Sequence, residues 1–528
     1  MIVLHVQVEK SACDVEHLKF GDHYSQLEEI WLGVVPIPTN NCFNNLKSLA
    51  VVKCESLSNV IPFYLLRFLR NLKKIEVSNC ESVKAIFDVK GAAADMKPIS
   101  LPLKKLILNQ LPNLEHIWNL NPREILSLQY LQEVSVSNCQ SLKSLFPASM
   151  ANHLVKLDVR ACATLMEIFA EADAAINGET KQFNFHCLTS LTLWELPELK
   201  YLYPGKHTLE WPMLTHLDIY HCDQLKLFKT EHGGDEFADT EDQLCISIDQ
   251  QAAFSVEKVF PKLVQLSLKK EEAMAIAQGQ FQEHGAIGPG EFGTKAAHLL
   301  HNLEVLKLMC YHEDEESDIL SSGLFEEIPT IQNLEVVCSS FTEIFSSQRP
   351  RSDCTKVLSK LKRLHLKSLQ KLISIGLEQS WVEPLLKTLE TLEVFCCPML
   401  KSVAPATVCF SNLTSLNVAE CDGLLYLFTS STAKSLNQLR DMSVRDCQAI
   451  QKIVWNDEED NESSDEEIIT FEQLRDMSLA SLPSIVGICS GALKLKFPSL
   501  DEVTLTECPH MKYSYVPNLH EFKPRQQL

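Results

Sequence analysis

A twelve-residue hydrophobic pattern, Leu-x-x-Leu-x-Leu-x-x-Cys-x-x-Leu, recurs along almost the whole chain, and its positions are numbered 1 to 12 below. LQEVSVSNCQSL, which starts at Leu131 and has Cys139 at position 9, is a clear copy. Copies with cysteine at position 9 start at Leu46, Leu72, Leu131, Leu154, Leu214, Leu389, Leu413, Leu439 and Leu500. Copies with leucine there start at Leu103, Leu188, Leu361 and Leu474, and weaker copies start at Leu27, Leu263, Leu303 and Ile331.

These seventeen copies recur with an average period of about 30 residues, which matches leucine-rich repeats at or just above the upper end of their usual range. The Leu-x-Leu alternation predicts a short strand with one apolar face. A single repeat cannot bury that face, so neighbouring repeats stack as a parallel sheet over one continuous core. The sequence therefore predicts an α/β leucine-rich-repeat solenoid, with a curved parallel sheet on its concave face and short helices and loops on its convex face.

The segments that precede the strands are expected to form the convex side. Apolar residues spaced three and four apart predict short helices within 60–72, 146–157 and 428–439. An aromatic residue often stands three positions before the first leucine, and these aromatic side chains are expected to be core spacers between repeats. They are Phe43, Trp211, Phe260, Phe410, Phe471 and Phe497.

Cysteine occupies position 9 in nine copies, out of 19 cysteines in the chain. Cysteine is among the most buried residue types and acts as a small hydrophobic side chain with a weak S–H donor. We therefore expect a row of buried free thiols, which fits a reducing compartment. A disulfide framework is the less favoured alternative.

The expected boundaries are soft, as in other solenoids. The repeats extend over 27–511, after a degenerate start at 1–26 and before a polar tail at 512–528. Irregular insertions are expected near 230–258, 271–300 and 456–468. The last insertion contains the acidic run from Asp457 to Glu467, which is expected to be a solvated loop.

Composition and charge narrow the choice of partners. Hydrophobic residues make up 45% and charged residues 22%, as in folded proteins. The formal net charge of −21 argues against nucleic acid or anionic lipid as the main partner. No apolar run reaches the roughly 20 residues that span a bilayer. The first ten residues lack the features of a secretory signal, so a cytoplasmic location is expected.

Apparent catalytic and metal motifs do not have the context that their chemistry requires. The G-x-G-x-x-G match from Gly288 to Gly293 does not follow a predicted strand, so no dinucleotide site is expected. Cys310-Tyr-His312, His221-Cys222 and Cys508-Pro-His510 lack the second pair that a zinc site needs. We therefore expect no enzyme activity, no cofactor and no metal.

Residues 111–159, with LPNLEHIWNLNPREILSLQYLQEVSVSNCQSLKSLFPASMANHLVKLDV, are more specific than the generic repeat. They resemble the repeat region of plant intracellular nucleotide-binding leucine-rich-repeat disease resistance proteins of the coiled-coil class. Residues 428–460 and 260–268 show the same resemblance. The resemblance implies a role in plant defence, in which the repeats sense pathogen effectors or modified host proteins and restrain a nucleotide-binding domain. The phosphate loop and coiled coil of that family are missing here.

Two other functions stay open. A repeat-type substrate adaptor for ubiquitin ligation would need an F-box-like helical segment at its N-terminus, and residues 1–45 are too short for one and already enter a repeat. A generic protein-interaction scaffold would share the fold without the defence role.

Positions 3, 5, 7 and 8 are expected to leave the strand on its exposed face and to form the partner-binding surface. Large aromatic side chains there are exceptional and favour binding hot spots. Two adjacent turns carry such a group, and strands about 4.8 Å apart are expected to bring it together as one patch. Its members are Trp194, Glu195, His216, Asp218, Tyr220 and His221. Trp31 and Phe395 are isolated further candidates. The alternative is that these side chains pack against a loop or against another domain.

Overall fold

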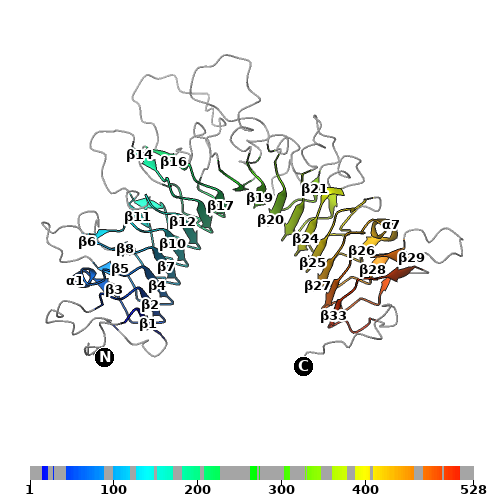
Figure 1. Cartoon of the computed structure of the whole chain (residues 1–528), viewed down its shortest axis with the longest axis horizontal. Helices are drawn as coiled ribbons and strands as arrows, with labels where there is room; N and C mark the ends of the chain where they lie inside the picture. Colours follow the sequence, from blue (N-terminus) through cyan, green and yellow to red (C-terminus); the bar gives the residue numbers. More distant parts are fainter. Residues whose placement is uncertain are drawn as a thin grey trace, which may run out of the picture. The chain divides into compact units, whose positions relative to one another are not determined.

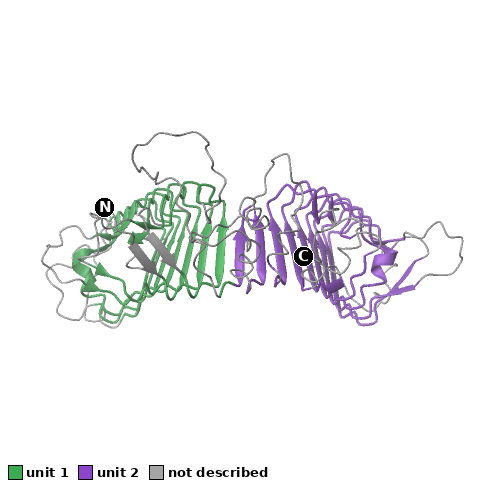
Figure 2. Cartoon of the chain, turned by 90° about the horizontal axis from the view of Figure 1, so that it is seen from above, with its two compact units in different colours: residues 1–263, 281–288 green, residues 264–280, 289–528 purple. Residues whose placement is uncertain are grey.

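The computed structural model describes residues 15–21, 28, 43–88, 99–118, 126–147, 152–170, 181–202, 207–225, 262–269, 273, 302–309, 328, 330–345, 360–376, 387–404, 408–456, 468–489 and 493–511. The chain forms two compact units (Figure 2). Unit 1 comprises Met1–Leu263 and Phe281–Gly288, and unit 2 comprises Val264–Gln280 and Pro289–Leu528. Most of the three expected insertions and the whole of the expected tail lie outside the described residues.

Unit 1 is a stack of short parallel strands that follow one another in chain order (Figure 1). They are β1 (His17–Phe20), β2 (Ser48–Val52), β4 (Lys74–Ser78), β7 (Lys105–Asn109), β10 (Glu133–Ser137), β12 (Lys156–Arg160), β15 (Ser190–Trp194) and β17 (His216–Tyr220). Each pairs with its neighbour without a shift, so that Leu49 lies beside Ile75 and Ile75 beside Leu106.

Unit 2 repeats the same arrangement. Its parallel strands are β18 (Gln265–Leu268), β19 (Val305–Met309), β20 (Asn333–Val337), β22 (Arg363–Lys367), β24 (Thr391–Phe395), β25 (Ser415–Ala419), β27 (Asp441–Arg445), β30 (Asp476–Ala480) and β33 (Glu502–Thr506). The fold is the predicted leucine-rich-repeat solenoid with a parallel sheet.

The predicted repeats match these strands closely. Sixteen of the seventeen copies begin a strand two residues after their first aliphatic residue, and the copy at Leu27 lies outside the described residues. The remaining strand, β1, lies within 1–26 and uses Val15 at position 1, with Leu18 and Phe20 facing inward. In most copies the side chains at positions 1, 4, 6, 9 and 12 are fully buried, because they face the space that neighbouring repeats share.

Two of the three short helices expected on the outer side are present. Segments 60–72 and 428–439 contain helices of four residues each, α1 (Phe63–Leu66) and α7 (Ser430–Ala433). The described part of 146–157 contains no helix and begins with β11 (Phe146–Pro147). Nowhere in the described ranges is a helix long and apolar enough to cross a membrane.

Small parallel ladders, which the sequence pattern did not predict, also lie on this outer side (Figure 1). In unit 1 they are formed by β3 (Asn59–Pro62), β5 (Ala85–Asp88) and β8 (His116–Trp118), by β6 (Ile99–Ser100) and β9 (Leu126–Ser127), by β11 and β13 (Phe169–Ala170), and by β14 (Lys181–Asn184) and β16 (His207–Glu210). In unit 2 they are formed by β21 (Glu343–Phe345) and β23 (Ser374–Gly376), by β26 (Tyr426–Thr429), β28 (Lys452–Trp455) and β31 (Gly487–Cys489), and by β29 (Ile468–Thr470) and β32 (Lys494–Lys496). Backbone groups on this side therefore bond to the next repeat instead of within a helix turn.

Buried aromatic rings fill the space behind the sheet. Five of the six predicted spacers are described and all five are at most 6% exposed, while Phe260 lies outside the described residues. In unit 1 successive rings lie 4.7–6.5 Å apart between centroids. This aromatic row consists of Phe87, Trp118, Phe146, Phe169, Phe185 and Trp211. The rings thus join one repeat to the next on the outer side of the core.

The turn after each strand depends on a left-handed residue at position 8. All fourteen described residues at this position have φ between 48° and 57°, although none is glycine. Such a backbone costs about 1–2 kcal/mol for most residues. It aims the N–H of position 8 at the carbonyl of position 7 in the following repeat, as in the bond from Asn79 to Asn109 at 3.0 Å. The left-handed conformation therefore adds one hydrogen bond between each repeat and the next.

The thiols at position 9 complete the same turn. Each of the nine donates to the carbonyl oxygen of position 7 in its own repeat, at 3.2–3.8 Å. All nine are buried and free. Contact with the Cys397 thiol, with burial, raises the pKa of Cys421 to about 12, so that this thiol stays protonated and can donate. At Ser339, a serine hydroxyl in the same position donates to Val337 at 3.0 Å.

Removing one such sulfur is expected to weaken the fold. Cys80 is fully buried, donates to Ser78 and accepts from the backbone N–H of Cys54. Cys80→Ala should lower the free energy of unfolding by about 1–2 kcal/mol, because it leaves a void and an unpaired buried amide. Urea unfolding followed by circular dichroism measures the loss. Cys187→Ala, at a half-buried cysteine outside the row, should change stability much less, and equal effects would contradict this account of the row.

Candidate functional site

Trp194 and Tyr220 stack on the exposed face of the sheet in unit 1. Each is the last residue of its strand, and β15 and β17 pair so that the two residues are direct neighbours. Their ring centroids are 4.0 Å apart and their planes are tilted by 30°. The backbone N–H of Glu195 donates to the carbonyl of Tyr220 at 2.8 Å, which fixes the two strand ends relative to each other. The expected proximity of these two residues is therefore present.

Arg160 extends the stack on the other side of Trp194. It ends β12, its neighbour in register is Trp194, and its guanidinium lies 5.8 Å from the indole centroid. Both oxygens of Asp158 hold it, at 2.7 Å and 3.2 Å from two guanidinium nitrogens. This bond, with the nearby charge of Asp218, raises the pKa of Arg160 above its ordinary value. The guanidinium is therefore a fixed cation beside the ring.

His221 lies against the other end of the stack. Its ring centroid is 4.1 Å from that of Tyr220, and its own backbone is left-handed with φ 48°. Tyr220 is only 6% exposed, so the expectation that it is an exposed contact residue is wrong. The rings of Trp194 and His221 pack against it and exclude solvent. Its role is to support Trp194, which stays half-buried.

The other predicted members of the patch are less tightly placed. Glu195 is exposed at the start of the turn, and Asp218 is half-buried on β17. His216 is exposed at the opposite end of β17, and its Nδ1 lies 2.8 Å from the hydroxyl of Thr215. It lies four positions from Tyr220 along the strand, a distance of about 13 Å. His216 therefore does not belong to the stack.

The two isolated candidates have different outcomes. Phe395 ends β24 in unit 2, is half-buried, and has its ring 5.3 Å from that of His365 on β22. His365 in turn places Nδ1 3.2 Å from a carboxylate oxygen of Glu393. Phe395 is thus part of a small cluster. Trp31 lies outside the described residues.

Arg160 and Asp158 were not among the predicted site residues. They occupy positions 7 and 5 of the repeat before Trp194, so the same register argument applied one repeat earlier would have found them.

The sequence His221-Cys222 does not form a metal site, because the Cys222 thiol points into the core and donates to Tyr220. Within the described ranges, no group of three or more His, Cys, Asp or Glu side chains is placed to hold a metal ion.

Stacked parallel strands over a buried row of aliphatic residues and thiols define a leucine-rich-repeat solenoid, a scaffold for protein interaction. The sequence profile of the plant disease resistance protein RPS2-like leucine-rich repeats matches residues 14–158, 152–231 and 404–520. The chain therefore belongs to this family, as the resemblance noted in the sequence implied.

Three solved structures are among those to which the chain is similar. The chain is similar to TLR13 in its complex with ssRNA13, with a TM-score of 0.43 and 16% identity over 89% of this chain, and it spans 60% of the TLR13 chain. A leucine-rich-repeat protein of Leptospira interrogans matches with a TM-score of 0.32 and 15% identity, over 84% of this chain and 92% of its own. The functional domain of InlJ from Listeria monocytogenes, which includes a cysteine ladder, matches with a TM-score of 0.29 and 12% identity, over 83% of this chain and 71% of its own.

The two stacked aromatic residues should respond differently to truncation. Tyr220→Ala should lower the free energy of unfolding by about 3 kcal/mol, because it empties a buried ring position. Trp194→Ala should cost clearly less, because its indole is half-buried. Urea unfolding of both variants, followed by circular dichroism, gives the comparison. A larger loss in Trp194→Ala than in Tyr220→Ala would contradict the supporting role of Tyr220.

Proposed function

We propose that this chain acts in plant defence as a protein-recognition module that senses pathogen effectors or modified host proteins. The observation that carries the proposal is the stack of Arg160, Trp194 and Tyr220, in a chain of the disease-resistance repeat family. As a second part of the proposal, the solenoid restrains a nucleotide-binding domain in the resting state.

The stack has the chemistry of a binding hot spot. Arginine, tryptophan and tyrosine dominate the energy of protein interfaces when they are well packed. Here the Arg160 guanidinium and the Trp194 indole are held in place before any partner arrives, by Asp158 and by Tyr220. A partner therefore loses little side-chain entropy in ordering them, and more of the contact energy appears as affinity. Phe395 and Trp31 are secondary candidate contacts.

We also propose that the chain works in the cytoplasm. The fourteen described cysteines are free, and those at position 9 act as hydrogen-bond donors that a disulfide would remove. A reducing compartment preserves that arrangement. A fusion to a fluorescent protein in leaf cells tests the location.

Recognition through the stack predicts a selective loss on mutation. Proximity labelling from the tagged chain in infected leaf tissue should identify partners, whose affinities are then measured with purified proteins by calorimetry. Trp194→Ala should weaken at least one of these affinities by more than about tenfold, as hot-spot residues do. Tyr130→Ala removes a ring that is 49% exposed and stands just before position 1, so it is the matched control and should leave that affinity unchanged. If every partner binds Trp194→Ala as tightly as the unaltered chain, the stack is not the recognition site.

If the solenoid restrains a nucleotide-binding domain, the two should form a complex when they are supplied as separate proteins. The chain, mixed with a separately purified nucleotide-binding domain of an RPS2-like receptor, should co-elute with it in gel filtration and slow its nucleotide exchange. The InlJ domain serves as an unrelated solenoid control and should do neither. Absence of both effects would reject the restraint while leaving the recognition part intact.

A further inference from the structure

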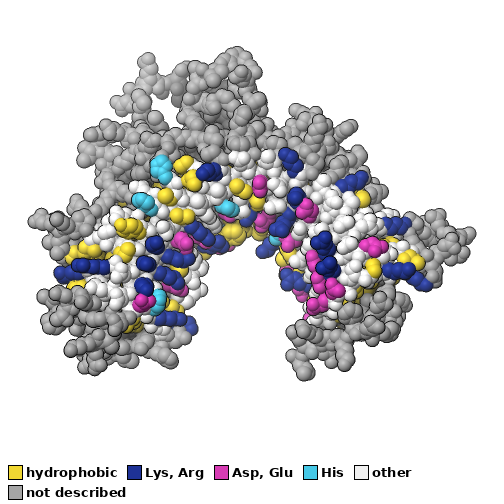
Figure 3. Space-filling view, viewed as in Figure 1, with side chains coloured by type: hydrophobic (Ala, Val, Ile, Leu, Met, Phe, Trp, Pro, Cys, Tyr) yellow, Lys and Arg dark blue, Asp and Glu magenta, His cyan; other side chains and the backbone are white. Residues whose placement is uncertain are grey.

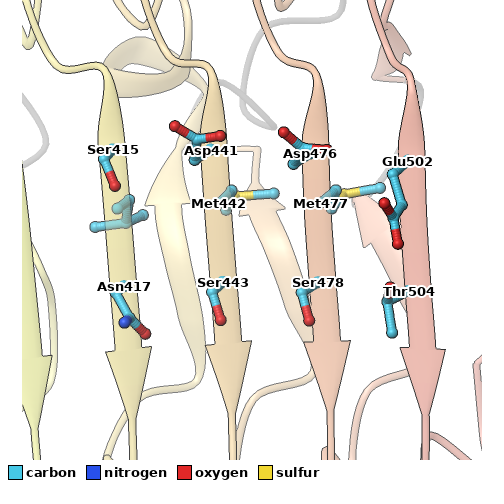
Figure 4. A pocket seen from close by; sticks show the side chains of 11 residues that line it. Ser415, Asn417, Asp441, Met442, Ser443, Asp476, Met477, Ser478, Glu502 and Thr504 are labelled. Atoms are coloured by element: carbon cyan, nitrogen blue, oxygen red, sulfur yellow. The ribbon is translucent and has the colours of Figure 1, made fainter.

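The exposed sheet face of unit 2 carries a hollow at its C-terminal end, over β25, β27, β30 and β33. Its volume is about 330 Å³, and two polar rows line most of it (Figure 4). The row at position 3 consists of Ser415, Asp441, Asp476 and Glu502, and the row at position 5 consists of Asn417, Ser443, Ser478 and Thr504. Figure 3 shows Asp and Glu side chains gathered over these C-terminal strands.

Three carboxylates are direct neighbours in this hollow. Asp441 pairs in register with Asp476, and Asp476 with Glu502, so adjacent carboxylates are attached to strands about 4.8 Å apart. Like charges directly opposite each other destabilise a sheet. Loss of hydration, and then the neighbouring Asp476, raise the pKa of Asp441 above its ordinary value. In the free protein Asp476 therefore disfavours the charged form of Asp441, while the charges of Arg440 and Arg475 act in the opposite direction.

The hollow offers acceptors to a ligand. Among the described residues, no Lys or Arg nitrogen lies within ion-pair distance of these three carboxylates. Independently, the Oδ1 atom of Asn417 is buried at the wall of the hollow and has no hydrogen-bond partner. Carboxylate and amide oxygens are hydrogen-bond acceptors, so this lining suits a ligand that supplies several N–H donors.

We propose that this hollow binds a basic protein segment, which places two or three arginine or lysine side chains on the row formed by Asp441, Asp476 and Glu502. The proposal rests on the proposed role in protein recognition, but it uses a surface in unit 2 that is separate from the Trp194 stack. The row spans about 10 Å. Basic residues at positions i, i+4 and i+7 of a helix span about the same length.

Charge complementarity explains why the repulsive row is present. A bound cation converts the repulsion between Asp441 and Asp476 into two attractions, and the hydroxyls of Ser443 and Ser478 accept the remaining N–H groups. Residues that break a local rule of stability are characteristic of functional surfaces.

The test uses a fluorescein-labelled alanine-rich helical peptide with arginines at i, i+4 and i+7, and fluorescence anisotropy with the whole chain. The combined substitution Asp441→Asn, Asp476→Asn and Glu502→Gln should weaken peptide binding about tenfold. The matched control, Glu55→Gln with Glu81→Gln and Glu115→Gln, removes the same charge from exposed carboxylates of unit 1 and should change binding less than twofold. A peptide with citrulline in place of arginine should bind neither form.

Equal weakening in the two triple variants would show that the peptide is attracted by the overall negative charge of the chain, and this would overturn the proposal. Unchanged binding in the triple variant of Asp441, Asp476 and Glu502 would also overturn it. Asp441→Asn alone should raise the urea midpoint of the free protein, because it removes repulsion in the folded state, and this readout shows that the variant folds. Trp194→Ala should bind the peptide normally. If the unaltered chain does not bind the peptide but binds its partner through Trp194, only the hollow is rejected. If it binds the peptide at the hollow but no partner depends on Trp194, only the Trp194 site is rejected.

Discussion

The unshifted register between neighbouring strands is the constraint on which each unit depends. Because position 4 of one repeat always lies beside position 4 of the next, as Leu106 lies beside Ile75 and Val134, aliphatic side chains meet in continuous rows. A shift by one residue would turn every inward side chain outward. The left-handed residue at position 8 helps to hold this register, since its N–H bonds to the end of the strand in the next repeat. The thiol at position 9 instead bonds to the end of its own strand.

The same register decides which exposed side chains lie next to one another. The resulting contacts stabilise the free protein at position 7 and destabilise it at position 3. At position 7 it brings Arg160, Trp194 and Tyr220 into one stack, where cation–π and aromatic contacts stabilise the free protein. At position 3 it aligns Asp441 with Asp476, where repulsion destabilises it. A rigid stack suits a contact that a partner meets already formed. A repulsive row suits a contact that is completed only when the partner brings the opposite charge.

Burial changes the role of the aromatic residues that the sequence pattern identified as candidate contacts. Trp194 and Tyr220 occupy the same template position, but Tyr220 is covered by the ring of His221 as well as by Trp194. Phe395 likewise contacts His365 instead of standing alone. An interface built on such residues depends on neighbours that the partner never touches, so mutations at those neighbours affect affinity through stability and position.

The sequence alone determined the strands, the rows of inward-facing aliphatic side chains and the buried thiols, because each follows from a local pattern that recurs in every repeat. It also placed Trp194 next to Tyr220, since register follows from that periodicity. The tertiary structure decided what the pattern does not encode: the small ladders on the outer side, the burial of Tyr220, and the hydrogen bonds that hold Arg160 to Asp158. These depend on how side chains from different repeats fill a common space, and the hollow beside Asn417 exists only where four particular strands meet.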